Sequence, residues 1–169
     1  MALLDLRDVA FAQGGRTLLK PFSLTLEPGE RHTASFASPV EAAIAARIAA
    51  GIVRATSGAA FINGFDPRIQ PVQAKRSVGY ISAALFDAPF ANSDAYLRYR
   101  AVLWNVDADA VRRAGDLARD PDLARWDASV ADALLGDPPL IVIENLDDEI
   151  ADALHRLRAD ITILRTATR

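Results

Sequence analysis

The chain has 169 residues, of which 51% are hydrophobic and 24% are charged, and this length and composition are typical of one soluble globular domain. A formal net charge of −3 gives no electrostatic basis for binding nucleic acid or an anionic membrane surface. The absence of cysteine excludes disulfides, iron–sulfur clusters and thiol catalysis.

Strand-like and helix-like segments alternate along the chain. The first two strand-like segments flank Gly14 and Gly15, which suit the two-residue turn of a β-hairpin. We expect strands over 2–12, 16–27, 31–37, 59–62, 77–82, 139–144 and 160–166. We expect helices over 39–50, 71–76, 93–105, 108–118, 123–135 and 147–158. This alternation predicts an α/β fold with a parallel core, to which the strand at 31–37 belongs, and a small antiparallel β layer.

The helix expected at 39–50 has its own N-terminal cap. Ser38 is a favourable N-cap, Pro39 suits the first helical position, and Glu41 completes a capping box. These side chains satisfy N–H groups that a phosphate would otherwise bind. Glu41 would also repel a phosphate, by about 4 kcal/mol per like-charge pair at roughly 4 Å and an effective dielectric of ~20. We therefore predict that this helix end binds no nucleotide.

The segments on both sides of this helix start resemble the nucleotide-binding subunit of ATP-binding-cassette (ABC) transporters. The resemblance is carried by residues 22–31, 45–58, 78–82 and 133–143. It is strong over 1–82 and 129–144 and weak over 84–128, so it covers nearly the whole chain.

The resemblance implies a P-loop NTPase-like, ABC ATPase-like core of mostly parallel strands with an antiparallel β layer. It also implies a single nucleotide-binding domain over 1–169, with a shortened helical subdomain at roughly 84–128. The family's C-terminal strands and helices would be missing, so the domain is expected to be truncated at its C-terminus.

The positions that bind phosphate in this family carry other residues here. The family's loop reads G-x-x-x-x-G-K-[ST], in which the lysine reaches the terminal phosphates and the hydroxyl holds magnesium. In the same frame, Phe36 and Glu41 take the two glycine positions, Ala42 takes the lysine position and Ala43 takes the hydroxyl position. The loop is therefore expected to be degenerate.

The other nucleotide contacts of the family are altered in the same direction. Gln13 stands where an aromatic ring would stack on adenine, Ala83 replaces the glutamine of the glutamine loop, and Ala167 replaces the switch histidine. The signature motif is replaced by 120–124, which contains two carboxylates and no glycine.

The strand at 139–144 resembles the one that leads to the Walker B acids, but Glu144 and Asn145 follow its apolar run. Asn145 is a poor general base because it is uncharged near neutral pH. Glu144 could still approach a cation. The plainer interpretation, which we favour, is that both residues cap the end of the strand.

Five aromatic residues of the helical subdomain could bind a partner or pack the local core: Phe86, Phe90, Tyr96, Tyr99 and Trp104. The resemblance implies that this region contacts the membrane subunit, and we take the first four as candidates for partner binding.

The two histidines, His32 and His155, are far apart in sequence and no cluster of ligands accompanies either. We therefore expect structural or surface roles for them, and no metal.

These observations predict a non-catalytic subunit without cofactor, which pairs with an active ABC ATPase subunit or docks on a membrane permease. We expect a cytoplasmic protein without direct membrane insertion, because no signal peptide or bilayer-spanning apolar run is present. The protein could be free or held at the inner membrane through a permease. Two alternatives stay open. One is a regulator that binds nucleotide through Arg31, Arg47 or Arg54 without hydrolysis, and the other is a divergent ATPase or another enzyme.

Overall fold

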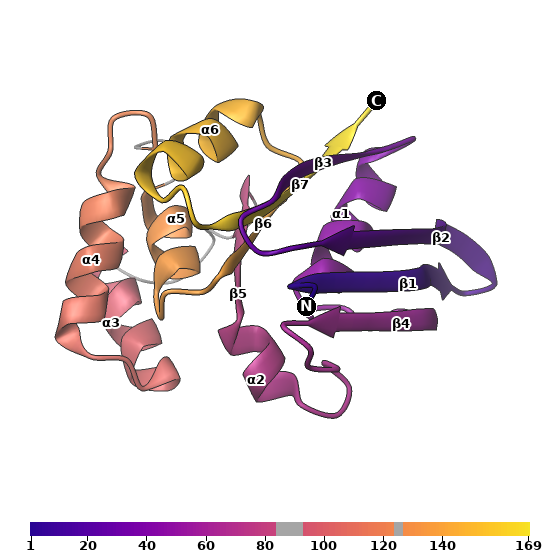
Figure 1. Cartoon of the computed structure of the whole chain (residues 1–169), viewed down its shortest axis with the longest axis horizontal. Helices are drawn as coiled ribbons and strands as arrows, with labels where there is room; N and C mark the ends of the chain where they lie inside the picture. Colours follow the sequence, from indigo (N-terminus) through magenta and orange to yellow (C-terminus); the bar gives the residue numbers. More distant parts are fainter. Residues whose placement is uncertain (84–92, 124–126) are drawn as a thin grey trace.

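The computed structural model describes residues 1–83, 93–123 and 127–169 (Figure 1). The described strands are β1 (Leu4–Gln13), β2 (Arg16–Leu26), β3 (Arg31–Phe36), β4 (Ser57–Ile62), β5 (Val78–Ser82), β6 (Leu140–Glu144) and β7 (Thr162–Thr168). The described helices are α1 (Pro39–Ala49), α2 (Pro71–Arg76), α3 (Ser93–Trp104), α4 (Ala108–Ala118), α5 (Asp127–Leu134) and α6 (Asp148–Leu157). The predicted order of elements is therefore confirmed, with boundaries that differ by a few residues.

An antiparallel sheet with the strand order β2-β1-β4 forms one end of the molecule (Figure 1). β1 and β2 make the predicted hairpin, in which Gln13 pairs with Arg16. Gly14 and Gly15 both have left-handed backbone angles, with φ of 57° and 76°. A two-residue turn of this kind requires positive φ at both central positions, which glycine adopts without steric cost.

The second sheet is parallel, with the strand order β3-β7-β6-β5. β6 is one of its inner strands, and its residues 140–143 are fully buried, as expected for a strand covered on both faces. β3 belongs to this parallel sheet, as predicted for the strand at 31–37, but it lies at the edge of the sheet. Among the described strands, β3 pairs only with β7, and most of its residues are exposed because this edge position leaves one side of the strand uncovered.

Helix α1 lies between the two sheets, and the parallel sheet has a different hydrophobic cluster on each of its faces. One face of β6 and β7 packs with α1 and the antiparallel sheet through Leu140, Val142 and Leu164. The other face packs with α3, α4, α5 and α6 through Ile141, Ile143 and others. The helices α3 to α5 therefore gather at the end of the molecule opposite the antiparallel sheet (Figure 1).

A pair of glycine substitutions tests the close approach of β5 to α5. A Cβ at Gly79 would lie 2.1 Å from the carbonyl oxygen of Ala133 and 2.6 Å from Cδ1 of Ile141. We expect Gly79→Ala to lower the free energy of unfolding by about 1–3 kcal/mol in urea titrations. Gly115→Ala is the matched control, since its Cβ would meet nothing closer than 3.8 Å, and within α4 it should stabilise by roughly 0.5–1 kcal/mol. Equal effects of the two substitutions would contradict this packing.

Candidate functional site

Helix α1 begins with a variant of the predicted capping box, in which the return bond of Glu41 goes to Ala37 and not to Ser38. Oγ of Ser38 accepts a hydrogen bond from the backbone N–H of Glu41 at 3.2 Å, and the Glu41 carboxylate accepts one from the N–H of Ala37 at 3.1 Å. The N–H of Ala42 donates to the Ser38 carbonyl at 3.1 Å, and Pro39 has no N–H. Among the first four helical residues, Val40 alone keeps an N–H for which the described residues supply no acceptor.

The side chains next to the start of α1 pack against other side chains of the protein. The ring of Phe36 meets that of Phe22 edge to face, with the centroids 5.3 Å apart, and so holds β3 against β2. Ala42 is completely buried and Ala43 is half-buried. The methyl group of Ala42 therefore contacts the core and not an open anion site.

Glu144, at the end of β6, is held by residues of two other elements. Arg47 of α1 donates from Nε and Nη2 to the two carboxylate oxygens, at 2.9 and 3.0 Å. The hydroxyl of Tyr80, on β5, also donates to Oε2. The Glu144 side chain is only 10% exposed, so the carboxylate is largely removed from water and compensated by these two partners.

The contacts in this cluster shift the protonation equilibria of the two donors. The hydrogen bond to Glu144, followed by that to Tyr80, raises the pKa of the Arg47 guanidinium above its ordinary value. Burial, followed by the hydrogen bond to Glu144, raises the pKa of Tyr80 to about 12. At neutral pH, Arg47 is therefore positively charged and Tyr80 is neutral.

Asn145 takes the expected capping role, whereas Glu144 does not. The N–H of Asn145 donates to the carbonyl of Thr166 at 3.0 Å, and its side-chain oxygen accepts from the Thr168 hydroxyl at 3.2 Å. Glu144 forms the ion pair described above in place of a cap. The sequence indicates Arg47 only as a possible phosphate ligand and does not indicate Tyr80, because a lone tyrosine in a strand carries no functional signal.

An open cavity of about 570 Å³ lies between the hairpin and α1, where the resemblance would place a nucleotide. Its lining is mainly apolar, and Gln13 contributes to one wall. Arg47 and Glu144 also line it, but they are paired with each other. The apolar lining residues are Phe11, Leu18, Pro39, Val40, Ala43, Ile44 and Val53. This lining offers little to a polyanion.

The three arginines considered as phosphate ligands are engaged in different places. Arg31 pairs with Asp148 and Asp152 of α6, and Arg47 pairs with Glu144. Arg54 lines a separate cavity beside Asp66. The structure therefore does not bring the three guanidinium groups together.

The two carboxylates at the signature position also have partners within the chain. Asp120 and Asp122 pair with Arg156 of α6, at 3.5 and 2.7 Å. Ala83 is exposed and Ala167 is half-buried in β7, so the positions of the glutamine and the switch histidine carry only methyl groups.

Of the four candidates for partner binding, Tyr96 and Tyr99 lie on α3, whereas Phe86 and Phe90 lie outside the described residues. Tyr96 is half-buried and Tyr99 is 49% exposed.

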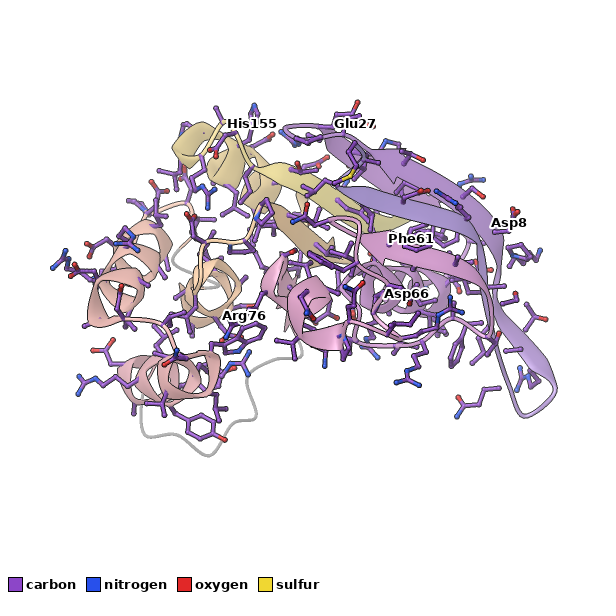
Figure 2. All side chains as sticks on the ribbon, turned by 60° about the horizontal axis from the view of Figure 1, so that its bottom comes forward. Asp8, Glu27, Phe61, Asp66, Arg76 and His155 are labelled. Carbon is purple, nitrogen blue, oxygen red and sulfur yellow. The ribbon has the colours of Figure 1, made fainter. Side chains whose placement is uncertain are left out.

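The two histidines lie on different elements. His32 is exposed on β3, and His155 lies on α6, away from Asp8 and Phe61 of the antiparallel sheet (Figure 2). Over 1–83, 93–123 and 127–169, no three His, Cys, Asp or Glu side chains are grouped so that they could hold a metal ion. None of the described helices has the length and apolar character needed to cross a bilayer.

No family model and no curated protein matches the sequence. Solved structures do match the fold. An ATP-binding subunit of an ABC transporter gives a TM-score of 0.75 at 20% identity, over 98% of this chain and 79% of the other. A component of the CbiONQ ABC transporter complex from Clostridium perfringens gives 0.76 at 17% identity, over 99% and 79%. A dimeric post-hydrolysis ATP-binding cassette bound to ADP and phosphate gives 0.75 at 15% identity, over 97% and 87%.

The chain has the fold of an ABC transporter ATP-binding subunit. The predicted fold class is thereby confirmed, including the P-loop NTPase-like parallel core and the antiparallel layer. Within this ABC fold, the capping box of α1 and the ion pair of Glu144 occupy the positions that the sequence frame assigns to the phosphate loop and to the Walker B acids.

The raised pKa of Tyr80 predicts a stability change at alkaline pH. Because its pKa is about 12 in the folded chain and 10.0 ordinarily, the folded state keeps the phenol proton longer than the unfolded state does. The stabilisation is therefore complete below about pH 10 and is lost as the pH rises towards about 12. In urea titrations we expect the free energy of unfolding to fall more steeply over this range for the wild type than for Tyr80→Phe. Parallel pH profiles would show that folding does not raise the pKa of Tyr80.

Proposed function

We propose that this chain is a non-catalytic ABC ATPase-like subunit, a structural or regulatory partner of an ABC transporter that does not hydrolyse ATP. The observation that carries the proposal is the capped start of α1, where only Val40 among the first four helical residues keeps an N–H without an acceptor in the described part of the chain. The fold supports a role in a transporter, and the occupied helix start supports a role without nucleotide.

Binding of a triphosphate at this position would be unfavourable in either of two ways. It would have to displace the Glu41 carboxylate from the N–H of Ala37, or else lie beside that negative charge. The dipole of α1 offers some compensation, but its donors are already used by the helix itself. Phosphate binding would therefore require the first turn to reorganise.

The residues that would hold magnesium or activate water are also engaged. A cation could reach Glu144 only by breaking its bidentate bond with Arg47 and the bond from Tyr80. Asn145 holds Thr168 and cannot accept a proton from water near neutral pH. These contacts favour a structural role for the end of β6.

The exposed face of α3 supports a role in protein binding. Val102 is 80% exposed and Leu103 is 59% exposed, and Tyr99 lies one helical turn before them on the same face. Contiguous exposed apolar side chains on one helix face are typical of a protein-binding surface. We propose that this face binds the ABC ATPase subunit or the membrane permease, and that contact with a permease would hold the chain at the membrane.

Addition of Mg-ATP tests the absence of nucleotide binding. With Mg-ATP at about 5 mM, a site with a Kd of about 50 μM would stabilise the chain by about 2.7 kcal/mol. We expect no rise in melting temperature and no heat in a calorimetric titration. Steady phosphate release by the purified chain that is lost in Glu144→Gln would instead establish a divergent ATPase.

Affinity purification of the tagged chain from its native host tests the partner. We expect recovery of an ABC ATPase subunit or a permease, and a drop of about ten-fold or more with the double change Val102→Asp and Leu103→Asp, since charges there oppose burial in an interface. Ile69→Asp is the control, because Ile69 is 77% exposed outside α3. Recovery of no transporter component, or equal losses for all variants, would contradict the proposal.

A further inference from the structure

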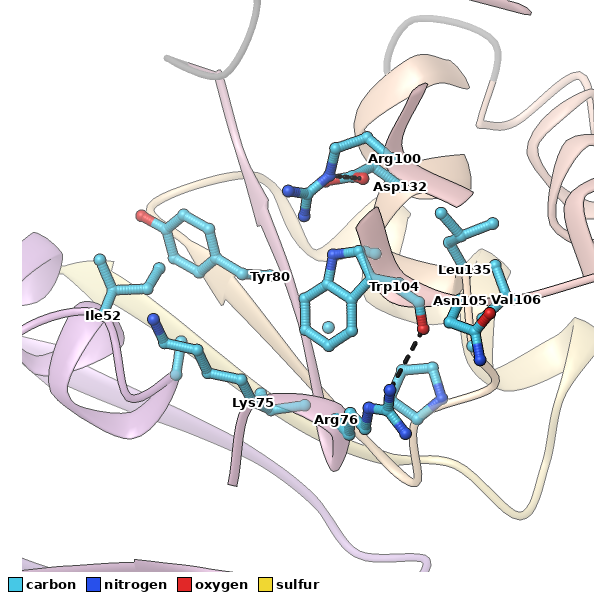
Figure 3. A pocket seen from close by; sticks show the side chains of 16 residues that line it. Ile52, Lys75, Arg76, Tyr80, Arg100, Trp104, Asn105, Val106, Asp132 and Leu135 are labelled. Carbon is cyan, nitrogen blue, oxygen red and sulfur yellow. Dashed lines mark hydrogen bonds and ion pairs between the residues drawn. The ribbon is translucent and has the colours of Figure 1, made fainter. Parts of the chain in front are cut away.

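A second cavity, of about 370 Å³, lies beside β5, and the ring of Tyr80, whose hydroxyl bonds Glu144, forms part of its wall (Figure 3). It is bounded by the end of α1, by α2, by the start of β5, by the end of α3 and by α5. Val78 and Pro138 belong to its lining, next to the N-terminal ends of β5 and β6, whereas Glu144 and α1's capping box lie at the C-terminal ends of the strands. This volume lies within the range of small-molecule sites.

Two aromatic rings face this cavity from different elements. Tyr80 of β5 and Trp104 of α3 stand on two sides of the space, and the Lys75 side chain extends below them (Figure 3). The guanidinium carbon of Arg100 lies 5.6 Å from the centroid of the Trp104 ring. Val78, Val106 and Leu135 add apolar surface. A flat apolar group could therefore contact both rings.

The charged groups of the cavity are mainly positive, although the whole chain has a net charge of −3. Lys75, Arg76 and Arg100 line it against one carboxylate, Asp132. Arg100 is neutralised by Asp132, with Nε 2.7 Å from Oδ1. The positive charges of Lys75 and Arg76 are therefore not neutralised by a carboxylate of the cavity.

The remaining cations are available to an anion. Arg76 donates from Nη2 to the Trp104 carbonyl at 3.3 Å, which leaves other guanidinium N–H groups and the whole charge uncompensated. Lys75 forms no ion pair within the described part of the chain. Asp132, being largely buried beside Arg100, disfavours a polyanion in the same space.

We propose that this cavity binds a small planar aromatic ligand with a single anionic group, of the aryl carboxylate class. The aromatic part contacts the rings of Tyr80 and Trp104, and the carboxylate is held by Lys75, whose side chain extends towards Tyr80 (Figure 3). The proposal does not depend on nucleotide binding or on the transporter role proposed above.

The test uses the indole N–H resonance of Trp104 in the full chain, labelled with nitrogen-15. The chain has two tryptophans, and loss of one indole cross-peak in Trp104→Phe assigns the resonance. The probe is 1-naphthoate, its neutral analogue is 1-naphthamide, and acetate is the anion without a ring. We expect 1-naphthoate to shift the Trp104 cross-peak saturably with a Kd below about 1 mM, and 1-naphthamide to bind about ten-fold more weakly.

Charge variants complete the test. Lys75→Gln should weaken 1-naphthoate binding by about five-fold or more, and Lys20→Gln, which removes an exposed charge on β2, should leave it unchanged. The dispersion of the backbone cross-peaks shows that each variant is folded. A shift that does not saturate, equal affinities for naphthoate and naphthamide, or an unaltered affinity in Lys75→Gln would each overturn the proposal.

Discussion

Close packing of α1 between the two sheets is the constraint on which the rest of the structure depends. The helix meets both layers through small side chains, since Ala42, Ala45, Ala46 and Ala49 are all at most 1% exposed. Small residues let the backbone approach its neighbours closely, and protein interiors leave little room for larger groups. The helix start is therefore fixed in position, at the edge formed by the ends of β3, β7 and β6. Whatever chemistry this edge can perform is decided by the side chains that follow those strands.

The fold could be predicted from the sequence because its signals are local. Gly14 and Gly15 mark the hairpin, Ser38, Pro39 and Glu41 mark the start of α1, and the apolar run 140–143 marks a buried strand. Each signal depends on residues close together in the chain. The exposure of β3 could not be predicted in this way, because strand order within a sheet depends on long-range pairing. Its pattern of small and polar residues was compatible with an inner or an outer position.

The candidate site was predictable only in part, for the same reason. The cap of α1 is formed within a few residues, so the sequence contains all of it. The cluster around Glu144 joins α1, β5 and β6, and the partners Arg47 and Glu144 are 97 positions apart. No periodicity relates such residues. The cavity beside Trp104 was missed entirely, since it depends on how α3 approaches β5 and on the charges that α2 supplies there.

The exposed position of β3 affects how this protein behaves at high concentration. In the parallel ladder the Glu30 and Phe36 carbonyls point to β7, so the peptide groups of Arg31, Thr33 and Ser35 point to the other side of the strand. Such a row of peptide groups is a template for adding strands from other molecules, which leads to fibres or amorphous aggregates. The six-residue length of β3 and the guanidinium at its start oppose that outcome. The shortness of β3 and the charge at its start therefore add to the net charge of the chain in opposing aggregation.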